Sequence, residues 1–147
     1  MRLWLDDWGI IDFNKRSPGL PRIHEAQMRI AVIEDEYLIA DDLVTEIWRR
    51  GHEPVGPFAK LSHALHAASR AAFDAALLDV DLQGQSSLEI ADLLLSRNIP
   101  FLIYTGYSRG VIPARYTPRV VEKPVWISGV VDRLSRNALM HGLGKPL

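Results

Sequence analysis

The sequence contains no cysteine, no long apolar run and almost no net charge. The absence of thiols excludes a disulfide scaffold and a zinc site built on cysteine. No apolar stretch approaches the roughly 18 residues that span a bilayer, and the N-terminus lacks the pattern of a signal peptide. A formal net charge of -1 gives no electrostatic indication of nucleic-acid binding. For a chain of 147 residues, these absences lead us to expect one cytoplasmic globular domain without nucleic-acid or membrane partners.

The first 27 residues differ from the remainder. They contain Pro18, Gly19 and Pro21 and show no sustained hydrophobic period, whereas Met28 opens a strand-like segment. We therefore predict a poorly ordered N-terminal extension over residues 1–27 and a domain over residues 28–147. The aromatic side chains of this extension leave a docking arm open as an alternative; they are Trp4, Trp8 and Phe13.

From residue 28 onward, strand-like and helix-like patterns alternate. We predict strands at 29–34, 55–58, 75–80, 100–105 and 119–122, and helices near 40–47, 61–72, 86–95 and 127–134. Ser86 and Glu89 form a capping-box pattern, and the prolines and glycines of 106–118 predict a fourth helix that is short or distorted. This alternation predicts an α/β fold, a doubly wound parallel sheet of five strands with helices on both faces, and a site beyond the carboxyl ends of its strands.

Those carboxyl ends carry reactive side chains. Glu34 and Asp35 follow the first strand, Asp79 the third, Thr105 the fourth and Lys123 the fifth. Two carboxylates about 4 Å apart repel by roughly 4 kcal/mol at an effective dielectric near 20, so such a cluster favours a bound cation. Oxygen ligands alone select Mg²⁺, which suits phosphoryl transfer. We expect Asp79 to attack phosphorus, with Thr105 and Lys123 contacting phosphoryl oxygens.

Four segments resemble the receiver domain of two-component response regulators: VIEDE (Val32–Glu36), LLDVDL (Leu77–Leu82), YTGY (Tyr104–Tyr107) and EKP (Glu122–Pro124). The resemblance implies a flavodoxin-like sheet of order 2-1-3-4-5 and Mg²⁺ as cofactor. It makes Asp79 the phosphoacceptor and Thr105 the switch hydroxyl, with Lys123 pairing to the phosphoryl group. The metal ligands would be Glu34, Asp35, Asp79 and the backbone carbonyl of Asp81. A cis peptide is expected at Lys123-Pro124.

The segment IPFLIYTGY is similar to a stand-alone group of alphaproteobacterial receivers with a Thr-Gly-Tyr motif. Only 24 residues follow Lys123, too few for a DNA-binding module. The resemblance implies a relay, sink or protein-binding switch that is not a turnover enzyme. Its phosphodonor would be a sensor histidine kinase or a histidine phosphotransfer protein, and a downstream protein target is possible.

One departure from the receiver pattern concerns the switch. Val120 occupies a position that is usually aromatic, and Tyr104 or Tyr107 is a candidate replacement. The side chain of Asp81 is expected to line the site and to affect access of water to the phosphoryl group. Tyr107 is expected to do the same by shielding the site. Trp126 is expected to anchor the last helix by packing.

Two other functions stay open at this point. LLDVDL has the Asp-x-Asp pattern of haloacid-dehalogenase-type phosphatases, in which Asp79 and Asp81 would act together. The receiver shape alone would also serve a phosphate-independent adaptor.

Overall fold

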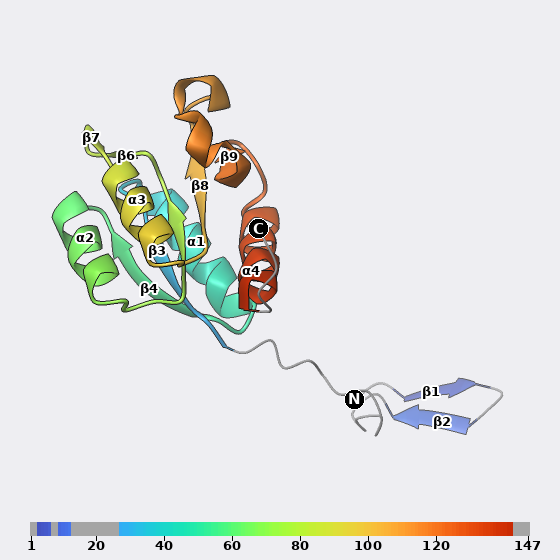
Figure 1. Cartoon of the computed structure of the whole chain (residues 1–147). Helices are drawn as coiled ribbons and strands as arrows, with labels where there is room; N and C mark the ends of the chain where they lie inside the picture. The colour runs from blue at the N-terminus through green and yellow to red at the C-terminus, as the bar shows by residue number, and fades with distance from the viewer. Residues whose placement is uncertain (1–2, 7–8, 13–26, 143–147) are drawn as a thin grey trace.

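The structure is a computed structural model that describes residues 3–6, 9–12 and 27–142. Five parallel strands form its main sheet in the order β4-β3-β5-β8-β9 (Figure 1). Their bounds are Glu53–Phe58, Arg29–Ile33, Ala75–Leu78, Phe101–Thr105 and Val120–Glu122. In chain order of these five strands this is 2-1-3-4-5, which confirms the predicted topology.

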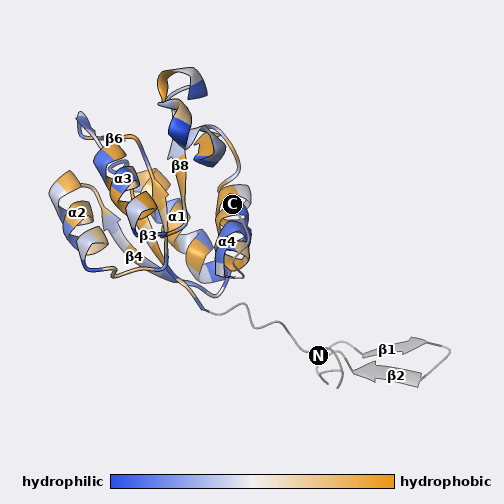
Figure 2. Ribbon diagram, viewed as in Figure 1, coloured by the Kyte–Doolittle hydropathy of each residue, from blue (hydrophilic) through white to orange (hydrophobic). Residues whose placement is uncertain are grey.

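Helices cover both faces of the sheet. α1 (Tyr37–Arg49) contacts α4 (Ile127–Gly142) on one face, and α2 (Leu61–Ser69) contacts α3 (Leu88–Ser96) on the other (Figure 1). Successive residues of each strand point to opposite faces, so the core is divided into two clusters. Ile30, Val32 and Leu77 pack with residues of α1 and α4, whereas Ile33 and Leu78 pack with residues of α2 and α3. Figure 2 shows both hydrophobic and hydrophilic residues on these helices. This double burial explains the continuous apolar run of β5.

The connection from β8 to β9 contains no α-helix. Two 3-10 helices occupy it, η1 (Arg109–Val111) and η2 (Ala114–Arg119), and the predicted short or distorted fourth helix is thereby confirmed. Ile112 and the fully buried Tyr116 pack into the cluster beneath α3. The Tyr116 hydroxyl donates a hydrogen bond to the Asp92 carboxylate on α3. One aromatic side chain therefore fixes a segment that has little regular structure.

Two local predictions were wrong. The N-cap of α3 is Ser87 and not Ser86, and neither serine belongs to a capping box, although Ser86 Oγ accepts a hydrogen bond of 3.3 Å from the Leu88 amide. Trp126 is 87% exposed and does not anchor α4 by packing. The cis peptide expected at Lys123-Pro124 is confirmed.

An antiparallel pair of strands, β1 (Leu3–Asp6) and β2 (Gly9–Asp12), lies within the predicted extension, and the sequence pattern did not indicate it. Trp8 and Phe13 lie outside the described residues. The extension and the domain boundary at Met28 therefore stay predictions. Within residues 3–6, 9–12 and 27–142, no helix is long and apolar enough to cross a membrane.

Candidate phosphoacceptor site

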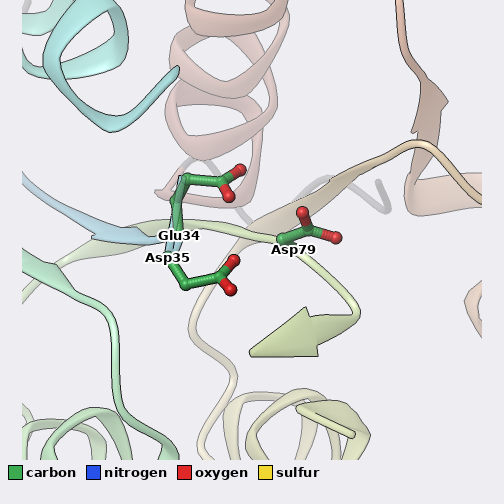
Figure 3. Close-up of side chains that lie close together, drawn as sticks. All are labelled: Glu34, Asp35 and Asp79. Carbon is green, nitrogen blue, oxygen red and sulfur yellow. The ribbon is translucent and has the colours of Figure 1, made fainter. Parts of the chain in front are cut away.

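Three carboxylates meet at the carboxyl ends of β3 and β5. Glu34 and Asp35 follow β3, and Asp79 follows β5, which lies beside it in the sheet. One oxygen from each lies within 4.8 Å of the others, and Figure 3 shows their carboxylates approaching one another. Glu34 and Asp79 are buried, whereas Asp35 is half-buried. The sequence-based grouping of these three residues thus corresponds to a real cluster.

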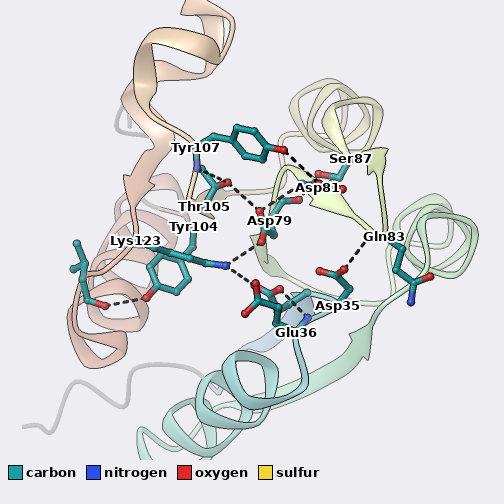
Figure 4. A network of polar contacts seen from close by, with 12 residues as sticks. Asp35, Glu36, Asp79, Asp81, Gln83, Ser87, Tyr104, Thr105, Tyr107 and Lys123 are labelled. Carbon is teal, nitrogen blue, oxygen red and sulfur yellow. Dashed lines mark hydrogen bonds and ion pairs between the residues drawn. The ribbon is translucent and has the colours of Figure 1, made fainter.

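Lys123 supplies the positive charge of this cluster. Its Nζ lies 2.9 Å from Asp79 Oδ2 and 3.0 Å from Glu34 Oε2 (Figure 4). Burial alone lowers the pKa of the Lys123 amine, but hydrogen bonds and the charges of Asp79 and Glu34 outweigh it and raise that pKa. Burial raises the pKa of Glu34, opposed by hydrogen bonds from the Glu36 amide and Lys123.

Asp79 is held from several sides. Its Oδ1 accepts a hydrogen bond of 2.9 Å from Thr105 Oγ1, which in turn accepts one from the Tyr107 amide at 3.3 Å. The Asp81 amide lies 3.4 Å from the same Oδ1. The backbone carbonyl of Asp79 accepts a hydrogen bond from the buried Ser87 hydroxyl at the start of α3. These contacts fix the direction of the carboxylate before any ligand arrives.

A short hairpin beside Asp79 completes the wall of the site. β6 (Asp81–Leu82) pairs with β7 (Gln85–Ser86), and the two turn residues, Gln83 and Gly84, both have positive φ. Such a two-residue turn with positive φ at both positions suits a tight hairpin. It aims the Gln83 amide at Asp35 Oδ2 (3.0 Å) and the Gly84 amide at Asp81 Oδ1 (2.7 Å).

The two candidate tyrosines occupy different environments. Tyr104 is buried against the α1 and α4 face, where its hydroxyl donates a hydrogen bond to the Val125 carbonyl at 2.9 Å. Tyr107 is 47% exposed and lies over the site, with its hydroxyl 3.3 Å from Asp81 Oδ2 (Figure 4). Tyr107, and not Tyr104, is therefore placed to shield Asp79.

A cavity of about 260 Å³ opens at this point; its lining residues are Asp35, Glu36, Asp79, Asp81, Gly106, Tyr107 and Lys123. The donor set facing it consists of carboxylate oxygens with no imidazole or thiolate, which fits a hard divalent cation such as Mg²⁺. Glu34, Asp35 and Asp79 are the side chains that would hold the ion.

Sequence reasoning missed two groups that hold the carboxylate residues of the site in place, the Ser87 hydroxyl and the Gln83 amide. A buried serine hydroxyl bonded to a backbone carbonyl has no sequence signature, because only the tertiary structure selects its partner. The two-residue strands of the hairpin are likewise too short for a periodic pattern, although the glycine at position 84 signals a turn.

Solved structures resemble this arrangement. SdrG from Sphingomonas melonis Fr1 is 32% identical over 77% of this chain and 97% of its own, with a TM-score of 0.67. This chain belongs to the response-regulator receiver family. The BeF3-activated conformation of SdrG from Pseudomonas melonis Fr1 is 35% identical over 76% of this chain and 95% of its own, with a TM-score of 0.61.

The response regulator PhyR from Brucella abortus is 26% identical over 81% of this chain, with a TM-score of 0.69. The chain spans about half of PhyR, 51% of its length. Neither a protein-family model nor a curated protein sequence matches the chain. Receivers are signalling domains, so the site is to be understood as part of a signalling protein.

Proposed function

We propose that this receiver is a phosphorylation switch with Asp79 as its phosphoacceptor. One observation carries the proposal: the Asp79 carboxylate contacts both Thr105 and Lys123 at the edge of an open, carboxylate-lined cavity. A carboxylate held by a hydroxyl and an ammonium in this way is oriented for attack on an electrophile that enters through the cavity.

The proposed reaction is transfer of a phosphoryl group from a phosphohistidine. A carboxylate oxygen of Asp79 forms a bond to phosphorus while the bond from phosphorus to the histidine nitrogen breaks, and that nitrogen leaves with the electron pair. Lys123 exchanges its contact with Asp79 for a phosphoryl oxygen, and the Thr105 hydroxyl donates to another. Both residues thereby stabilise charge that develops during transfer.

Mg²⁺ bound by Glu34 and Asp35, with Asp79 and the Asp81 carbonyl, would supply further positive charge for the phosphoryl oxygens. Without a cation, the three carboxylates face one ammonium, that of Lys123. This surplus of negative charge at the mouth of the cavity would repel a phosphorylated donor. The proposed transfer is therefore Mg²⁺-dependent.

The surface beside the cavity supports a protein as phosphodonor. Tyr37 and Leu38, directly after the acidic residues, are 77% and 76% exposed, and Trp126 lies in the turn after Lys123. A groove of about 710 Å³ between α1 and this turn is lined by Tyr104, Val125 and Trp126, among others. Exposed apolar side chains gathered near a reactive group are typical of an interaction site. We assign this surface to a sensor histidine kinase or histidine phosphotransfer protein.

The phosphorylated receiver would then act as a relay, a sink or a protein-binding switch in a two-component pathway. Phosphorylation adds negative charge beside Thr105, whose hydroxyl is bonded to the Tyr107 amide at the start of the β8–β9 connection. A change at Asp79 thus reaches that connection through a single intervening hydroxyl.

The decisive experiment is labelling by acetyl phosphate with Mg²⁺, read by intact-protein mass spectrometry. The wild type is expected to take up one phosphoryl group, and Asp79→Asn none. Asp81→Asn is the matched control, because its side chain is not the proposed acceptor, and it should still be labelled. Label on Asp79→Asn at wild-type stoichiometry would contradict the assignment.

Two further assays on the same protein test the two other functions, that of a phosphatase and that of a phosphate-independent adaptor. A phosphatase that uses Asp79 and Asp81 would release phosphate from a phosphomonoester over many turnovers, and Asp81→Asn would abolish that release. A phosphate-independent adaptor would bind its partner equally well with and without a beryllofluoride mimic of the phosphoryl group.

A further inference from the structure

Ser87 occupies the N-cap position of α3, but its side chain does not cap the helix. A serine at an N-cap ordinarily accepts a hydrogen bond from a backbone amide of the first turn. The Ser87 side chain makes no such bond. Its hydroxyl is fully buried and donates instead to the backbone carbonyl of Asp79 (Figure 4). The helix thereby forgoes the cap that its own N-cap serine could supply, and the hydroxyl serves the site.

The backbone of Ser87 adds a second tie to the same segment. Its amide donates to the Val80 carbonyl at 2.8 Å, so one residue holds two successive carbonyls, those of Asp79 and Val80. On the other side, the Asp79 amide donates to the Ile33 carbonyl of β3 at 2.9 Å. The main chain at Asp79 is thus fixed between the sheet and the start of α3.

These ties determine the direction of the next peptide groups, at Asp81. In the β6–β7 hairpin Asp81 faces Ser86, and the neighbouring pair of Val80 and Ser87 is hydrogen-bonded. Antiparallel pairs alternate between hydrogen-bonded and non-hydrogen-bonded, so the amide and the carbonyl of Asp81 both point out of the hairpin. The Asp81 amide lies 3.4 Å from Asp79 Oδ1, so this outer side faces the carboxylates.

The turn of the same hairpin contacts a further carboxylate of the site. The Gln83 amide donates to Asp35 Oδ2 at 3.0 Å. The hairpin enters α3 at Ser87, so loosening Ser87 would let both the Asp81 carbonyl and the Gln83 amide move away from the carboxylates.

We propose that Ser87 is a positioning residue for the cation of the site. It would touch neither the ion nor the phosphoryl group. By holding the carbonyls of Asp79 and Val80, it directs the Asp81 carbonyl towards the carboxylates that would bind Mg²⁺. The proposal rests on the proposed function, in which that carbonyl is a metal ligand. A ligand held in advance loses less conformational freedom when the ion binds, so the Ser87 hydroxyl should raise the affinity for Mg²⁺.

The test measures Mg²⁺ binding without a phosphodonor. MgCl₂ is titrated into the ¹⁵N-labelled full chain, and the amide signals of Asp35, Asp81 and Gly106, which line the cavity, report the dissociation constant. Ser87→Ala should raise that constant by about tenfold, the low end of what outer partners of metal ligands contribute. Labelling of the same variant by acetyl phosphate should slow at limiting Mg²⁺ and return to the wild-type rate when Mg²⁺ saturates.

Ser86→Ala is the matched control. Ser86 is exposed and lies one residue away in the same hairpin, where its hydroxyl oxygen accepts a hydrogen bond from the Leu88 amide. Its removal should leave the dissociation constant of Mg²⁺ unchanged. Ser87→Gly serves if Ser87→Ala does not fold, which a thermal melt reports. Glycine is well tolerated at an N-cap and also lacks the hydroxyl, so it should give the same rise.

Two results would overturn the role of Ser87 and leave the proposed function intact. A lower melting temperature of Ser87→Ala with an unchanged dissociation constant would make the hydroxyl purely structural. Labelling that slows equally at all Mg²⁺ concentrations would mean that Ser87 acts on the Asp79 carboxylate and not on the ion. A wild type that binds no Mg²⁺ would overturn the proposed function as well.

Discussion

Two regions, the end of the sheet around Asp79 and the connection between β8 and β9, are held by different kinds of contact. We call the first the acceptor end, because Asp79 is the proposed phosphoacceptor. At the acceptor end, Lys123 bridges the carboxylates of Glu34 and Asp79, and the Thr105 hydroxyl donates to Asp79. In the connection, Tyr116 and Ile112 are buried, and the polar contacts tie backbone and side chains to α3 and β9.

This difference shows which parts of the receiver tolerate redesign. The acceptor end must present particular functional groups at particular distances, so its residue types follow from the chemistry. The connection must only bury apolar surface and return the chain to β9, so two 3-10 helices serve in place of an α-helix. Function and packing can therefore be broken separately, by different substitutions.

Tyr116→Ala should break the packing alone, and it has the largest expected effect. Removal of a fully buried aromatic side chain costs about 3–5 kcal/mol of unfolding free energy. Urea denaturation measures this loss, while labelling of the molecules that stay folded should persist. Tyr116→Phe is the control: it keeps the ring and removes the hydroxyl, which bonds to Asp92, a side chain that is 54% exposed, and lies 3.5 Å from the Leu88 carbonyl. It should cost about 1 kcal/mol. Equal losses for the two variants would show that packing is not what holds the connection.

Lys123→Ala should break the chemistry and leave the connection in place. Loss of the ammonium removes a stabilising charge from the transferred phosphoryl group, and we expect labelling by acetyl phosphate to slow by about 10²-fold. The rate is measured by mass spectrometry at fixed Mg²⁺ concentration. Lys60→Ala, at an exposed lysine beside α2, should label at the wild-type rate. A rate for Lys123→Ala within threefold of the wild type would remove Lys123 from the proposed reaction.

The same division explains how much the sequence predicts. Acids at the ends of apolar strands are visible in a single sequence, and Glu34, Asp35 and Asp79 indeed converge. Contacts chosen by tertiary packing are not visible: the hydroxyl of Ser87 bonds to Asp79 instead of forming a cap. The prediction that Trp126 packs against α4 is wrong because its exposure depends on the direction of the turn before α4, which residue type does not reveal.

A third region, the contact between α1 and α4, contributes to stability and belongs to neither the acceptor end nor the β8–β9 connection. Glu46 pairs with Arg49 and Arg50, and Arg50 also pairs with Asp132 on α4. Hydrogen bonds from Arg49 and Arg50 lower the pKa of Glu46 to about 2. Because the folded-state pKa lies below the ordinary value of 4.5, the stabilisation is complete above pH 4.5 and is lost as the pH falls towards 2.

Glu46→Gln should therefore lower the unfolding free energy by about 1 kcal/mol at pH 7, since one partner arginine is largely exposed. The difference from the wild type should shrink as the pH falls below 4.5, as followed by thermal melts across that range. Glu53→Gln, at an exposed glutamate, should show little difference at any pH. A difference for Glu46→Gln that stays constant down to pH 2 would contradict the assignment of the shift to the arginine contacts.

Tyr107→Phe has the smallest expected effect. It tests the contact between the start of the β8–β9 connection and the side chains around Asp79. Its hydroxyl makes one long contact with Asp81, at 3.3 Å, and the ring is half-exposed. Loss of a contact worth about 0.5 kcal/mol should free the ring and shorten the lifetime of the phosphoryl label about twofold, because water reaches Asp79 more often. Decay of the label after removal of acetyl phosphate gives the lifetime.

The double variant Tyr107→Phe with Asp81→Ala makes this test specific. If the two side chains act through their mutual hydrogen bond, the double variant should decay no faster than Asp81→Ala alone. Effects that multiply would mean that the Tyr107 hydroxyl shields Asp79 independently of its contact with Asp81. The connection would then influence the acceptor by covering it, and the polar contact between them would be incidental.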